Sequence, residues 1–211
     1  MTIATKALRT RMPPRARRAQ LLHCALAAFA EHGIARATHS HVAERACVSV
    51  SAVYSYFRTR DDLVEATLGE VEAYLDNIAA DFLGADKPVY DVLVGLAQGF
   101  AADSERRPDL IKVWLDWSTG VDATTWARYL EVLDRLHAAA RRVFERGKKE
   151  GLLSDRLDES AAARIYIGGG HTVALMQFAG VSHDQLDKVI DQLVRGVMGI
   201  GMDTAVHRSL T

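Results

Sequence analysis

The sequence contains few cysteines and prolines, and no run of alternating apolar and polar residues that would indicate a strand. Its two cysteines, Cys24 and Cys47, are too few for a disulfide framework, and no Cys-x-x-Cys spacing typical of zinc or redox sites occurs. This cysteine usage fits a reducing compartment such as the cytoplasm. Both thiols are expected to be small core residues of helices. With four prolines among 211 residues, the chain is predicted to be all-α.

The sequence also lacks a segment with the properties of a secretion signal or a membrane span. The amino terminus carries no apolar stretch. The longest run without Asp, Glu, Lys or Arg covers 19 residues, 165–183, and it includes glycines, Gln177 and two histidines. A membrane helix needs about 20 predominantly apolar residues, so we expect instead a helix that other helices bury on most sides.

The net charge of −1 conceals a strong asymmetry between the two parts of the chain. Residues 1–60 contain ten Lys or Arg and two acidic residues, a net charge of +8, so residues 61–211 carry −9. Chance segregation of surface charge is one explanation. The other is a basic module for a polyanion such as DNA, joined to an acidic body. We therefore predict two domains, 1–60 for DNA binding and 61–211 for ligand binding and dimerisation.

Apolar periodicity and capping residues predict about nine helices. Ser49 is a suitable N-cap for a short helix, Thr59 with Asp62 at N3 begins a long one, and Ser182 with Gln185 forms a capping box. The expected helices cover approximately residues 15–32, 38–46, 49–57, 60–83, 88–105, 108–118, 122–149, 158–180 and 183–202.

The stretch "VSVSAVYSYF", residues 48–57, indicates a function. Val50, Val53, Tyr54 and Phe57 stand at i, i+3, i+4 and i+7, which predicts a buried face. The other positions are small or carry hydroxyls, and none is charged, unlike a helix face exposed to water. With the preceding helix and the turn "CVS", the stretch forms a helix-turn-helix pattern, whose second helix enters the major groove of DNA. The alternative is a packed helix of a bundle.

The run "VSVSAVYSYFRTRDDL" resembles the signature of the TetR family of bacterial regulators, Val-Ser-x-Gly-Thr-x-Tyr-x-Tyr-Phe followed by Lys-Glu/Asp-x-Leu. Ser51 stands where glycine is usual, and Ala52 where a phosphate-binding threonine is usual. With the arm "TRMPPRARRAQL" and "LIKVWLDWS" at 110–118, the run is similar to the quorum-sensing master regulators of the LuxR/HapR type. The resemblance implies a TetR-like fold, a homodimer formed by the last two helices, a recognition helix that reads double-stranded DNA, and a body with a small-molecule pocket.

Candidate DNA contacts lie in the arm, in the two helices of the motif and just after them. The resemblance implies that Arg9 and Arg11 reach DNA from the arm, while Arg58 and Arg60 add positive charge where the recognition helix ends. His39 faces either DNA or solvent. The candidate DNA-binding residues are Arg9, Arg11, Thr38, His39, Ser49, Ser51, Ala52, Tyr54, Ser55, Tyr56 and Arg60.

Candidate ligand contacts lie in the body. His137 belongs to an apolar stripe with Leu130, Leu133, Ala140 and Phe144, and it is either a core histidine or a pocket residue. Three consecutive glycines inside a helix, 168–170, each cost about 1 kcal/mol relative to alanine. Close helix contact, which we favour, or a widened pocket would offset that cost. The candidate pocket residues are Trp114, Trp117, Leu133, His137 and Gly170.

The sequence contains no convincing catalytic, metal or cofactor motif. "GGGHT" is not a phosphate loop because no Lys-Ser/Thr follows it, and His39 and His41 point to different faces of a helix. No nucleophilic triad or paired-carboxylate motif stands in a suitable context. We therefore predict a cytoplasmic transcriptional regulator, repressor or activator, that needs no metal or cofactor and responds to a small apolar ligand. The alternative is a helical ligand-binding protein without DNA affinity.

Overall fold

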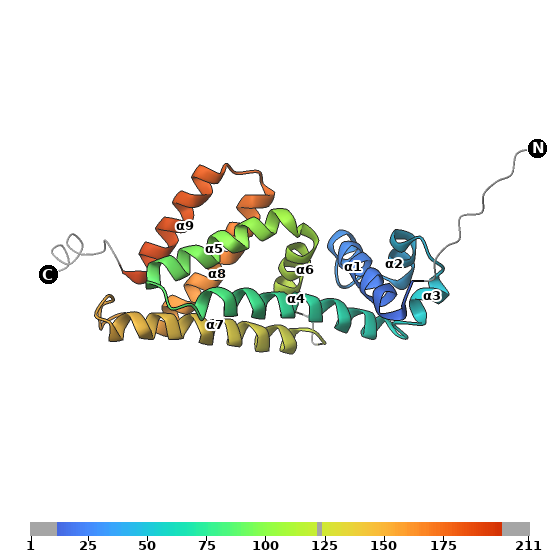
Figure 1. Cartoon of the computed structure of the whole chain (residues 1–211), viewed down its shortest axis with the longest axis horizontal. Helices are drawn as coiled ribbons and strands as arrows, with labels where there is room; N and C mark the ends of the chain where they lie inside the picture. Colours follow the sequence, from blue (N-terminus) through green and yellow to red (C-terminus); the bar gives the residue numbers. More distant parts are fainter. Residues whose placement is uncertain (1–11, 122–123, 200–211) are drawn as a thin grey trace, which may run out of the picture. The chain divides into compact units, whose positions relative to one another are not determined.

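The computed structural model describes residues 12–121 and 124–199. Within these ranges it contains nine α-helices and no strand (Figure 1), which confirms the prediction of an all-α chain. The helices are α1 (Pro14–His32), α2 (His39–Ala46), α3 (Val50–Tyr54), α4 (Arg60–Leu83), α5 (Val89–Arg106), α6 (Pro108–Thr119), α7 (Trp126–Lys149), α8 (Glu159–Phe178) and α9 (His183–Met198).

The chain divides into two compact units, Met1–Thr67 and Leu68–Thr211. The division falls inside α4, whereas the sequence placed it after residue 60, at the start of that helix. One continuous helix therefore belongs to both units: its first turns complete the small unit, and the remainder is a wall of the larger one.

In the first unit, α1, α2, α3 and the first turns of α4 enclose a small apolar core. Each helix contributes large side chains that are almost completely removed from solvent, and such burial is the main source of stability for short helices. The large, fully buried members are Leu21, Phe29, Val42, Val53, Phe57 and Leu63.

Side-chain caps determine where the helices of the first unit begin. The predicted N-cap at Ser49 is confirmed, because its Oγ accepts a hydrogen bond from Ala52 N at 3.2 Å. Thr59 and Asp62 cap α4 reciprocally, each accepting the other's backbone N–H at 3.0 Å. Thr38 occupies the N-cap position of α2, but its side chain makes no capping hydrogen bond.

In the second unit, α8 is the central helix and packs against α5, α7 and α9. The Tyr166 hydroxyl donates a hydrogen bond of 2.7 Å to Leu93 O on α5. Towards α9 the approach is so close that a Cβ on Gly169 would lie 2.3 Å from Leu193 Cδ2. Close helix contact thus accounts for one of the three consecutive glycines, as favoured from the sequence.

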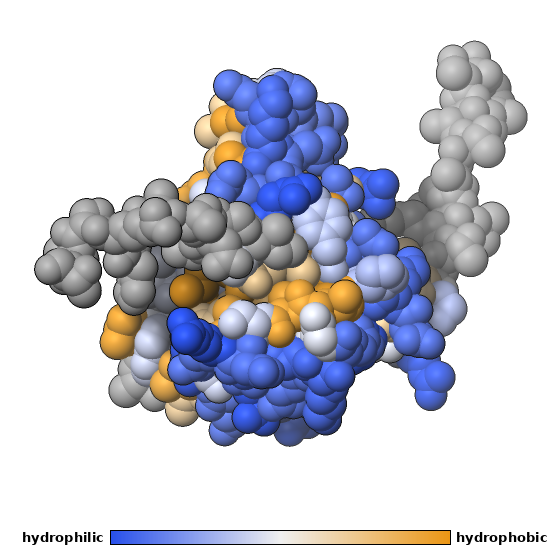
Figure 2. Space-filling model, turned by 90° about the vertical axis from the view of Figure 1, so that its left-hand side faces the viewer, coloured by the Kyte–Doolittle hydropathy of each residue, from blue (hydrophilic) through white to orange (hydrophobic). Residues whose placement is uncertain are grey.

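Several large apolar side chains of the second unit remain exposed. Figure 2 shows apolar residues (orange) that reach the surface between hydrophilic (blue) areas. An exposed apolar face is unusual for a domain that acts alone and commonly marks a contact surface. The exposed large apolar residues of this unit are Val121, Leu130, Leu152, Ile165, Leu175 and Phe178.

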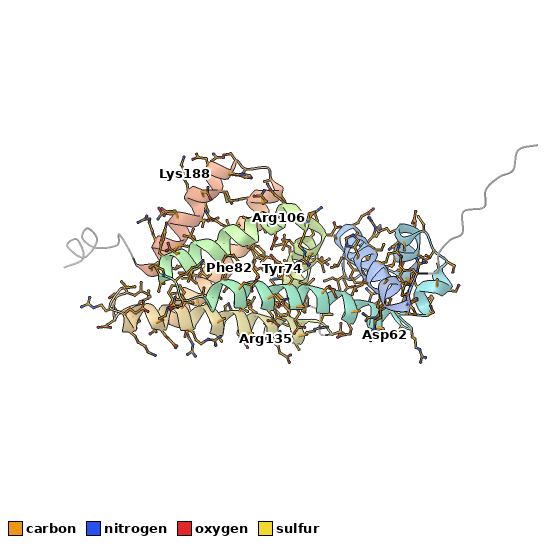
Figure 3. The ribbon with its side chains drawn as sticks, viewed as in Figure 1. Asp62, Tyr74, Phe82, Arg106, Arg135 and Lys188 are labelled. Atoms are coloured by element: carbon orange, nitrogen blue, oxygen red, sulfur yellow. The ribbon has the colours of Figure 1, made fainter. Side chains whose placement is uncertain are left out.

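Charged pairs join α4 to α7 in the second unit. Arg128 donates to Glu72 Oε2 at 2.7 Å, and Arg135, labelled in Figure 3, contacts Glu72 Oε1 at 2.5 Å and Asp76 Oδ2 at 3.1 Å. Burial raises the pKa of the Glu72 carboxyl, but the hydrogen bonds from the two arginines outweigh this effect and hold the pKa below its ordinary value.

Two expectations about buried residues were wrong. Cys47 is exposed and ends α2 in the left-handed conformation (φ 52°), and Cys24 is only half-buried, so neither is a full core residue. On α7 the buried face differs from the predicted stripe: Leu130 is exposed, and Leu133 and His137 are half-buried. The core positions of α7 are Tyr129, Val132, Leu136, Ala140, Val143, Phe144 and Gly147.

In residues 12–121 and 124–199, no helix is both long and apolar enough to cross a membrane. The same part of the chain holds no group of three or more His, Cys, Asp or Glu side chains that could bind a metal ion.

Candidate DNA-binding surface and ligand pocket

The surface of α3 is uncharged and more exposed than the sequence pattern suggested. Only Val53 and Phe57 of the predicted buried face lie in the core. Val50 and Tyr54 are 38% and 48% exposed. The helix ends at Tyr54, and the chain leaves helical geometry before Phe57. The short helix therefore presents apolar and hydroxyl groups, rather than charges, outside the core.

His39 is buried beneath this surface and contacts Tyr54 and Phe57. It is 4% exposed, and its Nε2 donates a hydrogen bond of 2.8 Å to Phe57 O. Its ring stacks on the ring of Tyr54, with centroids 4.0 Å apart and an interplanar angle of 9°. The expectation that His39 faces DNA or solvent is therefore wrong. His39 instead holds the Tyr54 ring in one orientation and leaves the phenol partly exposed.

The hydroxyls of the three exposed serines around α3 are partly engaged in the fold. Ser49 Oγ caps the helix and lies 2.9 Å from Ser51 Oγ, and Ser55 Oγ donates to Ala52 O at 2.7 Å. Ser55 can therefore accept a further hydrogen bond but has no proton left to donate. Ala52 and Tyr56 are half-buried on the same short segment.

The Arg60 guanidinium is occupied by hydrogen bonds within the first unit. It donates to Ile34 O and, at 3.3 Å from Nε, to Ala37 O, which braces the turn between α1 and α2. Arg18 is similarly committed, because its guanidinium lies 5.2 Å from the centroid of the Phe57 ring.

Two other arginines are better placed for phosphate groups. Arg15 and Arg58 are exposed, and neither makes a hydrogen bond or ion pair with the described residues. Thr38, at the start of α2, is exposed as well. The predicted contacts Arg9 and Arg11 lie outside the described residues.

An apolar pocket lies inside the second unit, among α4, α5, α6, α7, α8 and α9. It has about 540 Å³ of empty space, part of which is open to solvent. The Tyr166 hydroxyl is already bonded to Leu93 O, so it does not offer its proton to a ligand. The walls are formed by Leu75, Ile78, Ala79, Leu96, Ala97, Phe100, Trp114, Leu136, Tyr166, Ile167, Gly170, Val173 and Leu193.

Two of the five predicted pocket residues, Trp114 and Gly170, line this pocket. A Cβ on Gly170 would meet Trp114 at 3.8 Å, so this glycine widens the pocket, while its neighbour Gly169 serves helix contact. Trp117 does not line the pocket. It is buried, and its Nε1 donates to Thr125 O at 3.1 Å.

Leu133 and His137 also lie outside the pocket walls, half-buried on α7. Burial lowers the pKa of His137, the nearby Arg164 lowers it further, and Asp134 opposes both. Its buried Nδ1 has no hydrogen-bond partner in the described part of the chain. The neutral ring is therefore the favoured form in the fold.

Residues 21–67 match the family model described as "Bacterial regulatory proteins, tetR family". Over 190 residues, 90% of this chain and 93% of the relative, the sequence is 26% identical to the HTH-type transcriptional regulator LuxR of Vibrio harveyi. The match thus includes both the helix-turn-helix unit and the body. The chain is a DNA-binding transcriptional regulator whose helix-turn-helix unit matches the TetR family.

Solved structures agree with this TetR-family fold. A TetR-like transcriptional regulator from Rhodococcus sp. RHA1 superposes with a TM-score of 0.74 at 20% identity, covering 90% of this chain and all of that one. The regulator FadR from Bacillus subtilis, solved in complex with stearoyl-CoA, gives a TM-score of 0.68 at 17% identity, covering 86% and 98%.

The sequence did not single out several pocket residues of this regulator. Phe100, Leu136 and Tyr166 line the pocket beside Trp114. Their apolar spacing is the same as that of ordinary core residues, so only the packing of α5, α7 and α8 distinguishes them. Arg15 and Arg58 were visible as part of the basic charge, but their freedom from partners is a property of the fold.

Proposed function

We propose that this regulator binds a pseudo-palindromic operator as a homodimer, with α3 of each protomer in the major groove, and that a small, mostly apolar molecule in the pocket modulates binding. The observation that supports DNA reading most directly is the uncharged α3 surface, on which buried His39 orients Tyr54. Groups that read base edges need such close, pre-organised placement.

In this proposal α3 supplies specificity and the arginines supply affinity. The exposed groups of Ser51, Tyr54 and Ser55 contact base edges or phosphates, while Arg15 and Arg58 contact phosphates. Binding should therefore weaken steeply with salt, by orders of magnitude between about 50 and 200 mM. Arg58→Gln should lower affinity similarly on all DNA sequences and reduce the salt dependence, whereas Ser55→Ala should cost about 1–3 kcal/mol at the preferred site only.

The dimer interface we propose is the exposed face of α8, together with α9. Ile165 and Leu175 are 60% and 58% exposed. A Cβ on Gly168, between them, would meet no atom within 4 Å. Side chains at this spacing share one helix face, and the exposed Arg164 borders this otherwise uncharged face. Its exposed members are Ala161, Ile165, Gly168, Thr172 and Leu175.

Substitution on this face tests the dimer. Ile165→Arg should convert the protein to monomers in sedimentation experiments and abolish tight operator binding, while Asp155→Arg, on an exposed turn before α8, should do neither. A dimer that survives both Ile165→Arg and Leu175→Arg would place the interface elsewhere.

The effector proposal rests on the apolar pocket and on α4. Leu75, Ile78 and Ala79 of the pocket wall lie on the helix that begins at Arg60 in the first unit. A molecule that displaces this part of α4 can alter the spacing of the two recognition helices in a dimer, which must match about one DNA turn, 34 Å. The similar FadR binds stearoyl-CoA, which supports an apolar effector, and the likeness to LuxR supports a role in quorum sensing.

Gly170→Leu tests the effector proposal by filling the pocket. Ligand-dependent changes in Trp114 fluorescence and in DNA affinity should disappear in this variant, and persist in Gly170→Ala, which adds one methyl group in ordinary contact with Trp114. If apolar compound libraries and cell extracts alter neither signal in the unmodified dimer, the pocket is a packing defect.

As a chromosome-binding regulator the protein would act in the bacterial cytoplasm, and we propose no catalytic role because the named relatives are regulators.

A further inference from the structure

The apolar pocket adjoins a second pocket of a different character. This second pocket, a groove between α4 and α7, has about 610 Å³ of empty space and includes Asp76, Arg135 and Arg142. Ala79 and Leu136 line both pockets. These two side chains therefore stand between the groove and the apolar pocket, and a molecule in the groove needs only to displace them to reach the apolar pocket.

The groove is built from matching faces of its two helices. On α7, Arg135, Ala139 and Arg142 stand at i, i+4 and i+7 and so share one face. On α4, Asp76 and Ala80 share a face in the same way. On these faces Ala80 and Ala139 contribute only methyl groups beside the charged side chains.

The charges in the groove are not equivalent. Arg135 is neutralised by Asp76 and Glu72, which it contacts at 3.1 and 2.5 Å. Arg142 is exposed, and within the described ranges it makes no ion pair or hydrogen bond. The surplus charge of the groove is therefore one positive guanidinium, which lies six residues, or about 9 Å along the helix, from Leu136.

The apolar pocket, in contrast, has little with which to orient a ligand. The hydroxyl of Tyr166 is already bonded to Leu93 O. The other lining side chains are hydrocarbon or aromatic, and among them the indole of Trp114 has a polar atom, an uncharged N–H donor. Ligand sites normally combine apolar walls with a few polar groups that fix orientation. In the adjoining groove, Arg142 is a group with a free charge.

We infer that the effector is an amphipathic anion, with an aliphatic chain in the apolar pocket and a carboxylate or phosphate head group on Arg142. This inference rests on the proposed effector role of the pocket and specifies its ligand. A guanidinium suits the head group because it donates two parallel hydrogen bonds to a carboxylate or phosphate. The chain passes between Ala79 and Leu136 and bears on α4.

Matched ten-carbon probes test the head group by calorimetry with the full-length dimer, below their micelle concentrations. Decanoate should bind about tenfold or more tightly than decanol, and decyltrimethylammonium should bind no better than decanol. Decyl phosphate in a parallel titration distinguishes the two anionic head groups. Octanoate should bind more weakly than decanoate by on the order of tenfold, since two fewer methylenes are buried.

Arg142→Gln should lower the affinity for decanoate to that for decanol, and leave decanol binding unchanged. Arg141 is the matched control, because it carries the same charge one position away and pairs with Glu145 at 3.5 Å. Arg141→Gln should preserve the preference for decanoate. If decanol binds but the anion is not preferred, or Arg142→Gln keeps the preference, the head-group assignment is wrong while the apolar pocket stands. If none of the probes binds, both the effector proposal and the head-group assignment fail.

Discussion

Replacing His39 by alanine should destabilise the DNA-binding unit, although His39 lies directly beneath the proposed DNA surface. The side chain is 4% exposed, and Nε2 lies 2.8 Å from Phe57 O. A carbonyl oxygen can only accept a hydrogen bond, so Nε2 carries the proton. The ring also stacks on Tyr54 at a centroid distance of 4.0 Å. The substitution removes both interactions at once.

The magnitude follows from these two contacts. A buried carbonyl left without its donor costs about 1–3 kcal/mol, and the lost ring stack costs about 0.5–1.5 kcal/mol. We therefore expect His39→Ala to lower the free energy of unfolding of the first unit by roughly 2–4 kcal/mol. Hydrogen–deuterium exchange of the amides of α2 and α3 measures this quantity in the full-length protein.

Tyr54→Phe is the matched variant, because it keeps the stacked ring and removes only the exposed hydroxyl. It should leave amide protection unchanged and weaken operator binding by about 1 kcal/mol, roughly fivefold. The reasoning would be refuted if His39→Ala left the protection of α2 and α3 intact while abolishing DNA binding, since His39 would then be a DNA contact.

Three further substitutions test other parts of the structure. Ser49→Ala removes the cap of α3 and should lower the stability of the first unit by about 1 kcal/mol in urea unfolding. Gly169→Ala should displace Leu193 and cost the second unit about 1–3 kcal/mol, whereas Gly168→Ala should not lower its stability, as thermal unfolding would show. The pKa of Glu72 is lowered in the fold. The stability that the Glu72 carboxylate contributes is therefore present above the unfolded pKa of about 4.5 and is lost as the pH falls through the folded pKa. The urea midpoint of Glu72→Gln should depend less on pH between about 5 and 3 than that of the unmodified protein.

The sequence predicted the helices and their beginnings well because these depend on local chemistry. Ser49 and the Thr59–Asp62 pair cap their helices with bonds that span three residues. The signature, residues 48–63, contains these capping residues. The boundaries of α5 and α6 agree with the periodicity to within a residue for the same reason.

The functional surfaces were harder to predict because they depend on which face of a helix meets its neighbours. On α7 the apolar residues are dense enough for two registers, and packing chose the face with Leu136 rather than the one with Leu133. The sequence placed His39 on the surface, but its ring is buried and bonds the carbonyl of Phe57, which lies 18 positions further along the chain. Trp114 and Trp117 look equivalent in sequence, yet only Trp114 lines the pocket.

Selection of bound fragments from random double-stranded DNA, followed by footprinting and a salt titration, tests the central claim most directly. The account predicts enrichment of one two-fold symmetric site, protected by a dimer in two major grooves about one helical turn apart, with affinity that falls steeply with salt. Enrichment of no sequence, or tight binding by a monomer to an asymmetric site with a flat salt response, would contradict it.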